Sequence, residues 1–148
     1  DLSTVTARFR VTVEIPDFAQ KEGDSLTLRT AFLERGFTGL GGLAGRTERE
    51  HDLLLGAPQS MTLKVKYVLP EGWAVESLPE DLDIETAVGG FTSKAAGEGL
   101  ELTLERALRL NASRVKATEY PEFREAINRL TSVSAQRFKV KAGSNGEK

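Results

Sequence analysis

The chain of 148 residues lacks cysteine altogether and contains a single histidine, His51. Without cysteine it can form no disulfide, no thiolate nucleophile and no cysteine-ligated metal site. One imidazole also leaves little with which to build the histidine-assisted nucleophiles of hydrolases and acyltransferases. The composition therefore favours a non-catalytic role, and we expect neither a cofactor nor a metal ion.

An excess of positive charge and a long apolar run are also missing. The 20 Lys and Arg residues stand against 22 Asp and Glu residues, which gives a formal net charge of -2. Proteins that bind nucleic acid usually neutralise several phosphates with a basic surface. A helix that crosses a bilayer needs about 18 or more consecutive apolar residues, and the sequence has no such run. We therefore expect no nucleic-acid partner and no transmembrane segment.

The remaining composition is that of a globular protein, with 39% hydrophobic and 28% charged residues. A chain of this length most simply forms one domain, which we expect to cover residues 1–141. The chain begins with Asp1 rather than methionine, so we expect either an excised fragment or a processed product.

Apolar and polar residues alternate over much of the chain, which is typical of half-buried strands. The alternation at 61–69 is the clearest and predicts a central strand. The stretch 100–110 predicts a long strand in which Arg106 interrupts the apolar row, so we expect a bulge or bend there. The other predicted strands cover 5–15, 26–32, 73–78, 84–88, 91–95 and 136–141. With turn residues between them, they predict an antiparallel β-sandwich of about 8–9 strands.

One segment near the end of the chain has helical rather than alternating periodicity. Phe123, Ile127 and Leu130 recur at helical spacing, and Pro121 falls in the predicted first turn, where its missing N–H costs little. We expect one late α-helix over about 119–133. The last residues, 142–148, are polar and glycine-rich and predict a disordered tail.

The glycine-rich stretch 36–45 is the candidate partner-binding segment. It lacks both the Gly-Lys-Ser/Thr of a phosphate-binding loop and the glycine spacing of a dinucleotide-binding turn. Two interpretations remain open for its apolar side chains: they cover the protein's own sheet, or they dock on a partner. The candidate partner-binding residues are Phe37, Leu40 and Leu43.

A catalytic use of His51 would need a nucleophile that it could deprotonate. Asp52 adjoins it in sequence, and Thr47 and Ser60 are the nearby hydroxyls. No nucleophile-elbow motif surrounds either hydroxyl, so a loop histidine is the favoured interpretation.

Two groups of carboxylates are candidate sites. Glu101 and Glu105 could form a glycosidase pair, but we expect them to meet Lys64 and Lys66 across the sheet. A second cluster lacks the spacing of a calcium loop, and it favours a charged strand edge that discourages edge pairing; its members are Glu80, Asp81, Asp83 and Glu85.

Three aromatic residues are a candidate carbohydrate-binding platform, since aromatic faces stack on sugars. Tyr67, Trp73 and Tyr120 all fall within predicted strands or the first helical turn. That placement favours core or corner packing over a sugar site.

Four short segments resemble the carboxy-terminal domain of bacterial exported transglutaminase-like multidomain proteins. The most specific is Tyr-Pro-Glu-Phe-Arg, which opens the predicted helix after a long strand. The four segments are 68–73 (Val-Leu-Pro-Glu-Gly-Trp), 78–79 (Leu-Pro), 108–111 (Leu-Arg-Leu-Asn) and 120–124. Together they span about half of the chain.

In that family the Cys-His-Asp set lies in another domain. The resemblance therefore implies that this chain is a β-sandwich without catalytic residues. It therefore implies an accessory domain that packs against a neighbouring domain or protein partner, in a periplasmic or envelope-associated protein. The alternative is a sandwich module that binds a glycan or a peptide. This chain departs from the family pattern in its glycine-rich segment 36–45.

Overall fold

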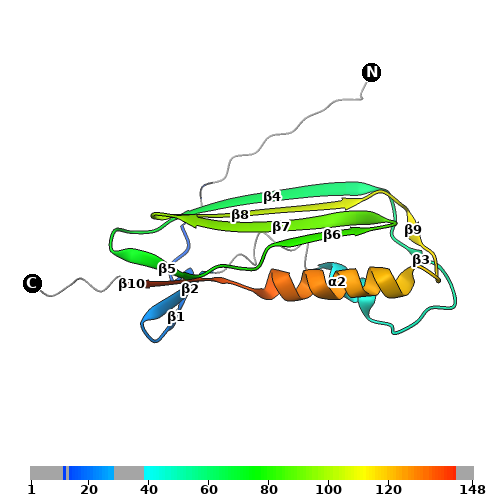
Figure 1. Ribbon diagram of the computed structural model, residues 1–148, viewed down its shortest axis with the longest axis horizontal. Coiled ribbons are helices and arrows are strands. Elements are labelled where there is room, and N and C mark those ends of the chain that lie inside the picture. Colours follow the sequence, from blue (N-terminus) through cyan, green and yellow to red (C-terminus); the bar gives the residue numbers. More distant parts are fainter. Residues whose placement is uncertain (1–11, 13, 29–38, 143–148) are drawn as a thin grey trace, which may run out of the picture.

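The computed structural model describes residue 12, residues 14–28 and residues 39–142 of the chain (Figure 1). This part contains ten β-strands in antiparallel pairs, one 3-10 helix and one α-helix late in the sequence. The expected mainly β fold with a late helix is confirmed. Most of the predicted strand 5–15, and the end of the predicted strand 26–32, lie outside the described residues.

The main layer is a four-stranded sheet of long strands, in the order β4 (Gln59–Val68), β8 (Glu101–Leu110), β7 (Gly89–Glu98) and β6 (Leu82–Thr86). Among the strands that the structure describes, β4 lies at an edge of this sheet, whereas the alternation at 61–69 predicted a central strand. The central strands β8 and β7 are the ones with the most completely buried inner residues.

The predicted bulge near Arg106 is wrong. The register of β8 runs without interruption from residue 101 to residue 110 against both of its neighbours. Arg106 continues the inward-facing row and is only 1% exposed. The chain keeps the strand regular by burying the arginine rather than turning it outward.

The inner face of this sheet is covered by two different elements (Figure 1). At one end lies α2 (Tyr120–Ala135), together with the 3-10 helix η1 (Gly39–Ala44). At the other end lies a smaller sheet in the order β1 (Ala19–Glu22), β2 (Ser25–Leu28), β10 (Phe138–Ala142) and β5 (Trp73–Ser77). A short pair, β3 (Leu53–Leu54) with β9 (Arg114–Val115), lies beyond the helix end of the main sheet.

The helix prediction is confirmed, with bounds of 120–135 against the expected 119–133. Phe123, Ile127 and Leu130 are all buried, and Pro121 lies in the first turn. At the other end of the chain, β1 and β2 form a tight hairpin, in which they are joined through Gly23 and Asp24. Gly23 has a φ of 65°, a conformation that glycine adopts without steric cost.

The buried side chains form two clusters, one under each covering element. The larger cluster joins α2 and η1 to the inner faces of β6, β7 and β8, and the smaller joins β2 and β10 to the far ends of β8 and β4. On β8, Leu108 and Leu110 belong to the first cluster, and Leu102 and Leu104 to the second. Arg106 lies between them on the same strand.

Candidate functional site

A groove runs between the edge strand β6 and helix α2. Its inner part is apolar and nearly filled, with about 20 Å³ of free space above side chains that include Phe91, Phe123 and Ile127. Its outer part is a more open hollow of about 160 Å³. Ile84, Thr86 and Ala126 line both parts, so the two form one continuous groove.

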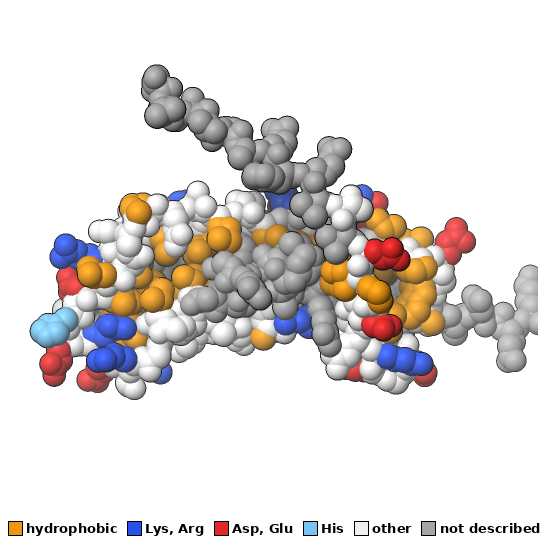
Figure 2. Space-filling view, turned by 180° about the vertical axis from the view of Figure 1, so that it is seen from behind, with side chains coloured by type: hydrophobic (Ala, Val, Ile, Leu, Met, Phe, Trp, Pro, Cys, Tyr) orange, Lys and Arg blue, Asp and Glu red, His pale blue; other side chains and the backbone are white. Residues whose placement is uncertain are grey.

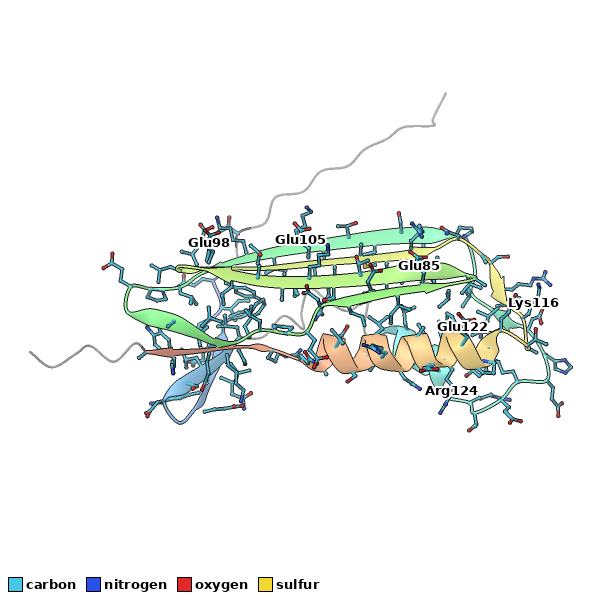
Figure 3. All side chains as sticks on the ribbon, viewed as in Figure 1. Glu85, Glu98, Glu105, Lys116, Glu122 and Arg124 are labelled. Atoms are coloured by element: carbon cyan, nitrogen blue, oxygen red, sulfur yellow. The ribbon has the colours of Figure 1, made fainter. Side chains whose placement is uncertain are left out.

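The rim of the outer part carries charged side chains from both elements. Glu85 comes from β6, whereas Glu122, Glu125 and Arg129 come from the exposed face of α2. Figure 3 shows Glu85 on the sheet and Glu122 on the helix at the same end of the molecule, with Arg124 on the opposite side of the helix. Because the carboxylate of Glu85 is paired with Arg109 on the outer face of the sheet, Glu122, Glu125 and Arg129 are the other charged side chains that line this groove.

Glycine determines the position of the charged pair above β6. Gly90 lies between Arg109 and Glu85 in the register of three adjacent strands. Without a side chain on Gly90, Arg109 reaches across it and donates to both carboxylate oxygens of Glu85, at 3.0 and 3.1 Å. A Cβ at Gly90 would lie 2.4 Å from Glu85 Oε1, so any larger residue there would displace the carboxylate.

At the neighbouring position, the backbone conformation and the close approach of β8 both require a glycine, Gly89. Its φ is 149°, and a Cβ built there would lie 1.9 Å from the carbonyl oxygen of Arg109. These two glycines let the turn between β6 and β7 pack closely on β8, which holds the β6 edge beside α2.

His51 lies in an exposed loop at one end of the molecule, among basic and acidic side chains (Figure 2). Asp52 has a structural contact: its Oδ1 accepts a hydrogen bond from the N–H of Ala117 at 3.1 Å. In the described residues neither Thr47 nor Ser60 hydrogen-bonds to His51. The structure therefore brings together no nucleophile and base at this position.

The same loop surrounds a wide polar hollow of about 510 Å³. Arginines and carboxylates alternate around it, so it has no preference for a ligand of one charge; its lining residues are Arg46, Glu48, Arg49, Glu50, His51 and Asp52. Beneath it, Arg49 stacks over the ring of Tyr120 with its guanidinium carbon 4.8 Å from the ring centroid.

Four of the candidate carboxylates, Asp81, Glu85, Glu101 and Glu105, make contacts within the sheet. The expectation for the glutamate pair is confirmed: Lys64 Nζ donates to Glu105 at 2.9 Å, and Lys66 lies 2.5 Å from Glu101. In the other cluster, Asp81 accepts a hydrogen bond from the N–H of Ala95 at 3.0 Å. Within the described ranges, no three His, Asp or Glu side chains are placed to hold a metal ion.

The three aromatic residues do not share a surface. Tyr120 is fully buried in the larger cluster, and its hydroxyl contacts the carbonyl oxygens of Leu43 and Arg46 at 3.1 and 2.9 Å. Tyr67 and Trp73 pack on the smaller cluster. The structure therefore supports a core-packing role for these three rings.

Residues 39–44 of the glycine-rich segment form η1 against α2. Leu40 is 8% exposed and belongs to the larger cluster, and Leu43 packs against that cluster from its edge. Both side chains thus pack on the protein's own core, and Phe37 lies outside the described residues.

Sequence reasoning missed the β6–α2 groove. The composition of β6 gave a partial signal, since four acidic residues within 80–85 indicated an edge strand. The helix that forms the other wall lies about forty positions later in the sequence, and only the tertiary packing places it there. In the part of the chain that the structure describes, no helix has the length and apolar character that crossing a bilayer requires.

The chain matches one protein family, and its fold is similar to part of a solved structure. Residues 24–139 match a family described as a domain of unknown function with a solved structure (DUF3858). A solved structure from Parabacteroides distasonis, described as a "putative protease", is similar with a TM-score of 0.56 at 17% sequence identity. The match covers 68% of this chain but 20% of that one, so this chain spans about a fifth of its length. No curated protein matches the chain.

Proposed function

The chain belongs to the DUF3858 family of domains of unknown function, and we propose that it is a non-catalytic interaction domain of a larger protein. In this proposal it packs against a neighbouring domain or a protein partner. The larger protein would be a transglutaminase-like protein of the bacterial periplasm or cell envelope, as the sequence resemblance implies.

The observation that carries the proposal is the share of the similar structure that this fold occupies. In the Parabacteroides distasonis protein the similar region is 20% of the chain, so the fold occurs there as one part of a much longer polypeptide. Domains of one polypeptide meet at interfaces that resemble transient protein–protein interfaces, so a domain within a longer chain is expected to pack against its neighbours.

The distribution of reactive side chains gives further support. His51 lies at one end of the molecule, whereas Glu101 and Glu105 are paired with lysines on the outer face of the main sheet. An active site needs such groups within hydrogen-bond reach of one another and of a substrate. The described residues show no such convergence.

The outer face of the main sheet is less suited to docking than the strand edges are. Its charges are matched in pairs across the strands, as in Lys64–Glu105 and Glu85–Arg109. Covering these pairs would remove water from both partners, at a cost that their attraction seldom recovers. A partner is therefore better accommodated at an edge.

The proposal is tested by separating the domain from the rest of its parent polypeptide. We expect the purified chain to bind the remaining domains in a calorimetric titration and to show no protease or transglutaminase turnover on peptide substrates. Peptide turnover that disappears in the variant His51→Ala would overturn the non-catalytic assignment. Absence of binding, with both parts folded, would overturn the interaction role.

A further inference from the structure

We propose that two copies of this chain associate through the edge strand β6 and the adjoining side of α2, related by a two-fold axis that passes beside Ile84. The two β6 strands would pair antiparallel, and the two α2 helices would lie side by side beneath them. This goes beyond the interaction role proposed above, because the occupant is a second copy of the chain. Three features carry the inference: an open strand edge, an apolar centre, and a charge pattern on α2 that is complementary to itself under the two-fold rotation.

The open edge supplies backbone hydrogen-bonding groups. β6 is the last strand of the main sheet, and no described strand lies beyond it. A two-residue turn joins β6 to β7, so alternation from that turn directs the N–H and C=O groups of Asp83 and Glu85 outward. In an antiparallel pair centred on Ile84, Asp83 of each copy lies opposite Glu85 of the other. The outward groups of these residues would then bond to one another across the axis.

The centre of the proposed contact is apolar. Ile84 on β6 and Ala126 on α2 are both partly buried, and both line the inner and the outer part of the groove. The outer hollow of about 160 Å³ opens beside them. In the dimer Ile84 of one copy would meet Ile84 of the other, which removes apolar surface from water. The small side chain of Ala126 would let the two helices approach closely.

The charge pattern of α2 identifies the second copy as the occupant. On the side that lines the outer hollow, Glu122, Ala126 and Arg129 follow one another along the helix; we call these three residues the contact row. At 1.5 Å per residue, Glu122 lies about 6 Å before Ala126, and Arg129 lies about 4.5 Å after it. A two-fold axis near Ala126 therefore brings Glu122 of each copy opposite Arg129 of the other.

The charges of the contact row are available for such pairing. Glu122 and Arg129 are exposed, and neither makes an ion pair with any residue that the structure describes. Glu125 lies about 60° around the helix from Glu122, so it stands beside the contact row rather than in it. Because α2 runs in the opposite direction to β6 (Figure 1), one rotation makes both the strands and the helices antiparallel.

One contact on the outer face of the sheet opposes the association. Pairing centred on Ile84 places Asp83 opposite Glu85 of the second copy, and like charges directly opposite are destabilising. Arg109 lessens the effect, since it donates to both carboxylate oxygens of Glu85. The acidic edge would thus exclude strands that bring no matching helix layer, while the contact row favours a second copy.

Other occupants suit this surface less well. A docked helix would leave the outward N–H and C=O groups of β6 without partners. A glycan would lack a stacking surface, since no tryptophan or tyrosine is among the described lining residues of the groove. An isolated strand could pair with β6 but would bring no helix to meet the contact row.

The test measures the oligomeric state of the 148-residue chain by sedimentation equilibrium. The contact consists of one short strand and part of one helix, which is less than most stable interfaces bury, so we expect a reversible dimer with a Kd of about 10–100 μM. A chain that remains monomeric up to about 1 mM would overturn the inference.

Charge reversal tests the contact row. Glu122→Arg and Arg129→Glu should each weaken the dimer by at least about tenfold, because each change turns two attractions into repulsions. Mixed in equal amounts, the two variants should form a heterodimer within about threefold of the original affinity, since every arginine then faces a glutamate. Glu122→Arg raises the formal net charge from -2 to zero, so overall charge does not draw the two variants together. A mixture that stays monomeric, with the helical circular dichroism of both variants unchanged, would overturn the pairing.

A matched control places the same charge change elsewhere. Glu98→Arg alters an exposed glutamate in the sheet-covered end of the molecule, where Figure 3 shows it. The dimer of this variant should form within about twofold of the original affinity. Equal weakening by Glu98→Arg and Glu122→Arg would indicate an effect of net charge alone and would overturn the inference.

Two substitutions of Asp83 test the strand pairing. Asp83→Asn should strengthen the dimer by roughly twofold to fivefold, because it removes the like-charge contact with Glu85 of the second copy. Asp83→Pro removes the same charge together with the outward N–H, a change that an edge strand tolerates. It should bind at least about tenfold more weakly than Asp83→Asn. Equal affinity of these two variants would show that the edges do not pair.

The outcome is separable from that of the proposed function. If the remaining domains of the parent polypeptide bind the chain, and Glu122→Arg abolishes that binding while the chain alone stays monomeric, the surface belongs to a neighbouring domain. The dimer is then overturned and the interaction role stands. If the dimer forms as expected and the remaining domains do not bind, the dimer stands and the proposed function fails.

Discussion

At one end of the main sheet the inner side chains pack against α2, and at the other end they pack against β10 and β2 of the small sheet. We call these the helix-covered half and the sheet-covered half. Leu108 and Leu110 of β8 belong to the first, and Leu102 and Leu104 of the same strand to the second. The inner side chains of this one strand are therefore covered by a helix at one end and by a sheet at the other.

A single segment, 120–142, provides the central element of both coverings. It begins as α2 and continues as β10 after Gln136, whose backbone is extended with φ -68° and ψ 152°. Two arginines lie at this change of structure: Arg106 donates to the carbonyl oxygen of Val133 at 3.4 Å, and Arg137 donates to that of Ser134 at 2.9 Å. Cations at a helix C-terminus are favourable because they meet the negative end of its dipole. The two halves therefore differ in covering element but are joined covalently and through Arg106.

The largest effect is expected from Phe123→Ala in the helix-covered half. Phe123 is 3% exposed, and truncating a buried phenylalanine costs roughly 3–5 kcal/mol of unfolding free energy. Urea denaturation can be followed in each half separately: the helical circular dichroism signal reports α2, and the fluorescence of Trp73, the single tryptophan, reports the sheet-covered half. Because β8 and 120–142 run through both halves, we expect the two midpoints to fall together.

Arg124→Ala is the control for this prediction, since Arg124 lies on the opposite side of α2 from Glu122 (Figure 3). It should cost far less than Phe123→Ala. If Phe123→Ala lowers the midpoint of the helical signal but leaves that of Trp73 unchanged, the halves unfold independently and the comparison describes two separate units.

Sequence periodicity predicted the elements of both halves better than it predicted their arrangement. Helical spacing at Phe123, Ile127 and Leu130 located α2 to within two residues, because its buried stripe is encoded locally. Alternation located the four strands of the main sheet for the same reason, whereas it did not indicate the short strands β1, β3 and β9. It did not reveal that β4 lies at an edge of the described sheet, since edge and central strands can share one pattern when one face is solvated. It also did not reveal that a helix replaces half of the second sheet.

The next effect concerns Arg106, which lies at the boundary between the two halves. Its Nε donates to Ser93 Oγ at 3.3 Å, and its Nη2 to Val133 O. Arg106→Met keeps much of the aliphatic volume but leaves these buried acceptors without that donor, so we expect a loss of about 1–3 kcal/mol. Arg106→Ala should cost more, because it also leaves a cavity. Chemical denaturation with both probes measures the loss and shows whether the halves remain coupled.

An Arg106→Met protein at least as stable as the unmodified chain would mean that the arginine's desolvation outweighs its hydrogen bonds. The burial of Arg106 was not evident from its residue type, since arginine is almost never fully buried unless it is paired. Its position was nevertheless informative: Arg106 occupies an inward position of an otherwise apolar row, and a regular strand can only bury it there. The groove beside β6 was less predictable still, because it depends on how α2 packs against a strand distant in sequence.

The smallest effects are expected from the charge pairs on the outer face, one in each half. In the helix-covered half, Arg109 donates to both oxygens of Glu85 across Gly90, whereas Lys66 and Glu101 in the sheet-covered half make a single contact. All four side chains are more than half exposed, so both couplings are small. Double-mutant cycles to alanine should give about 0.5–1 kcal/mol for Arg109–Glu85 and about 0.2–0.5 kcal/mol for Lys66–Glu101. Both should shrink in 1 M salt, where the screening length is about 3 Å. Equal couplings would show that the two-oxygen contact over Gly90 adds nothing, and the outer faces of the two halves would then be energetically alike.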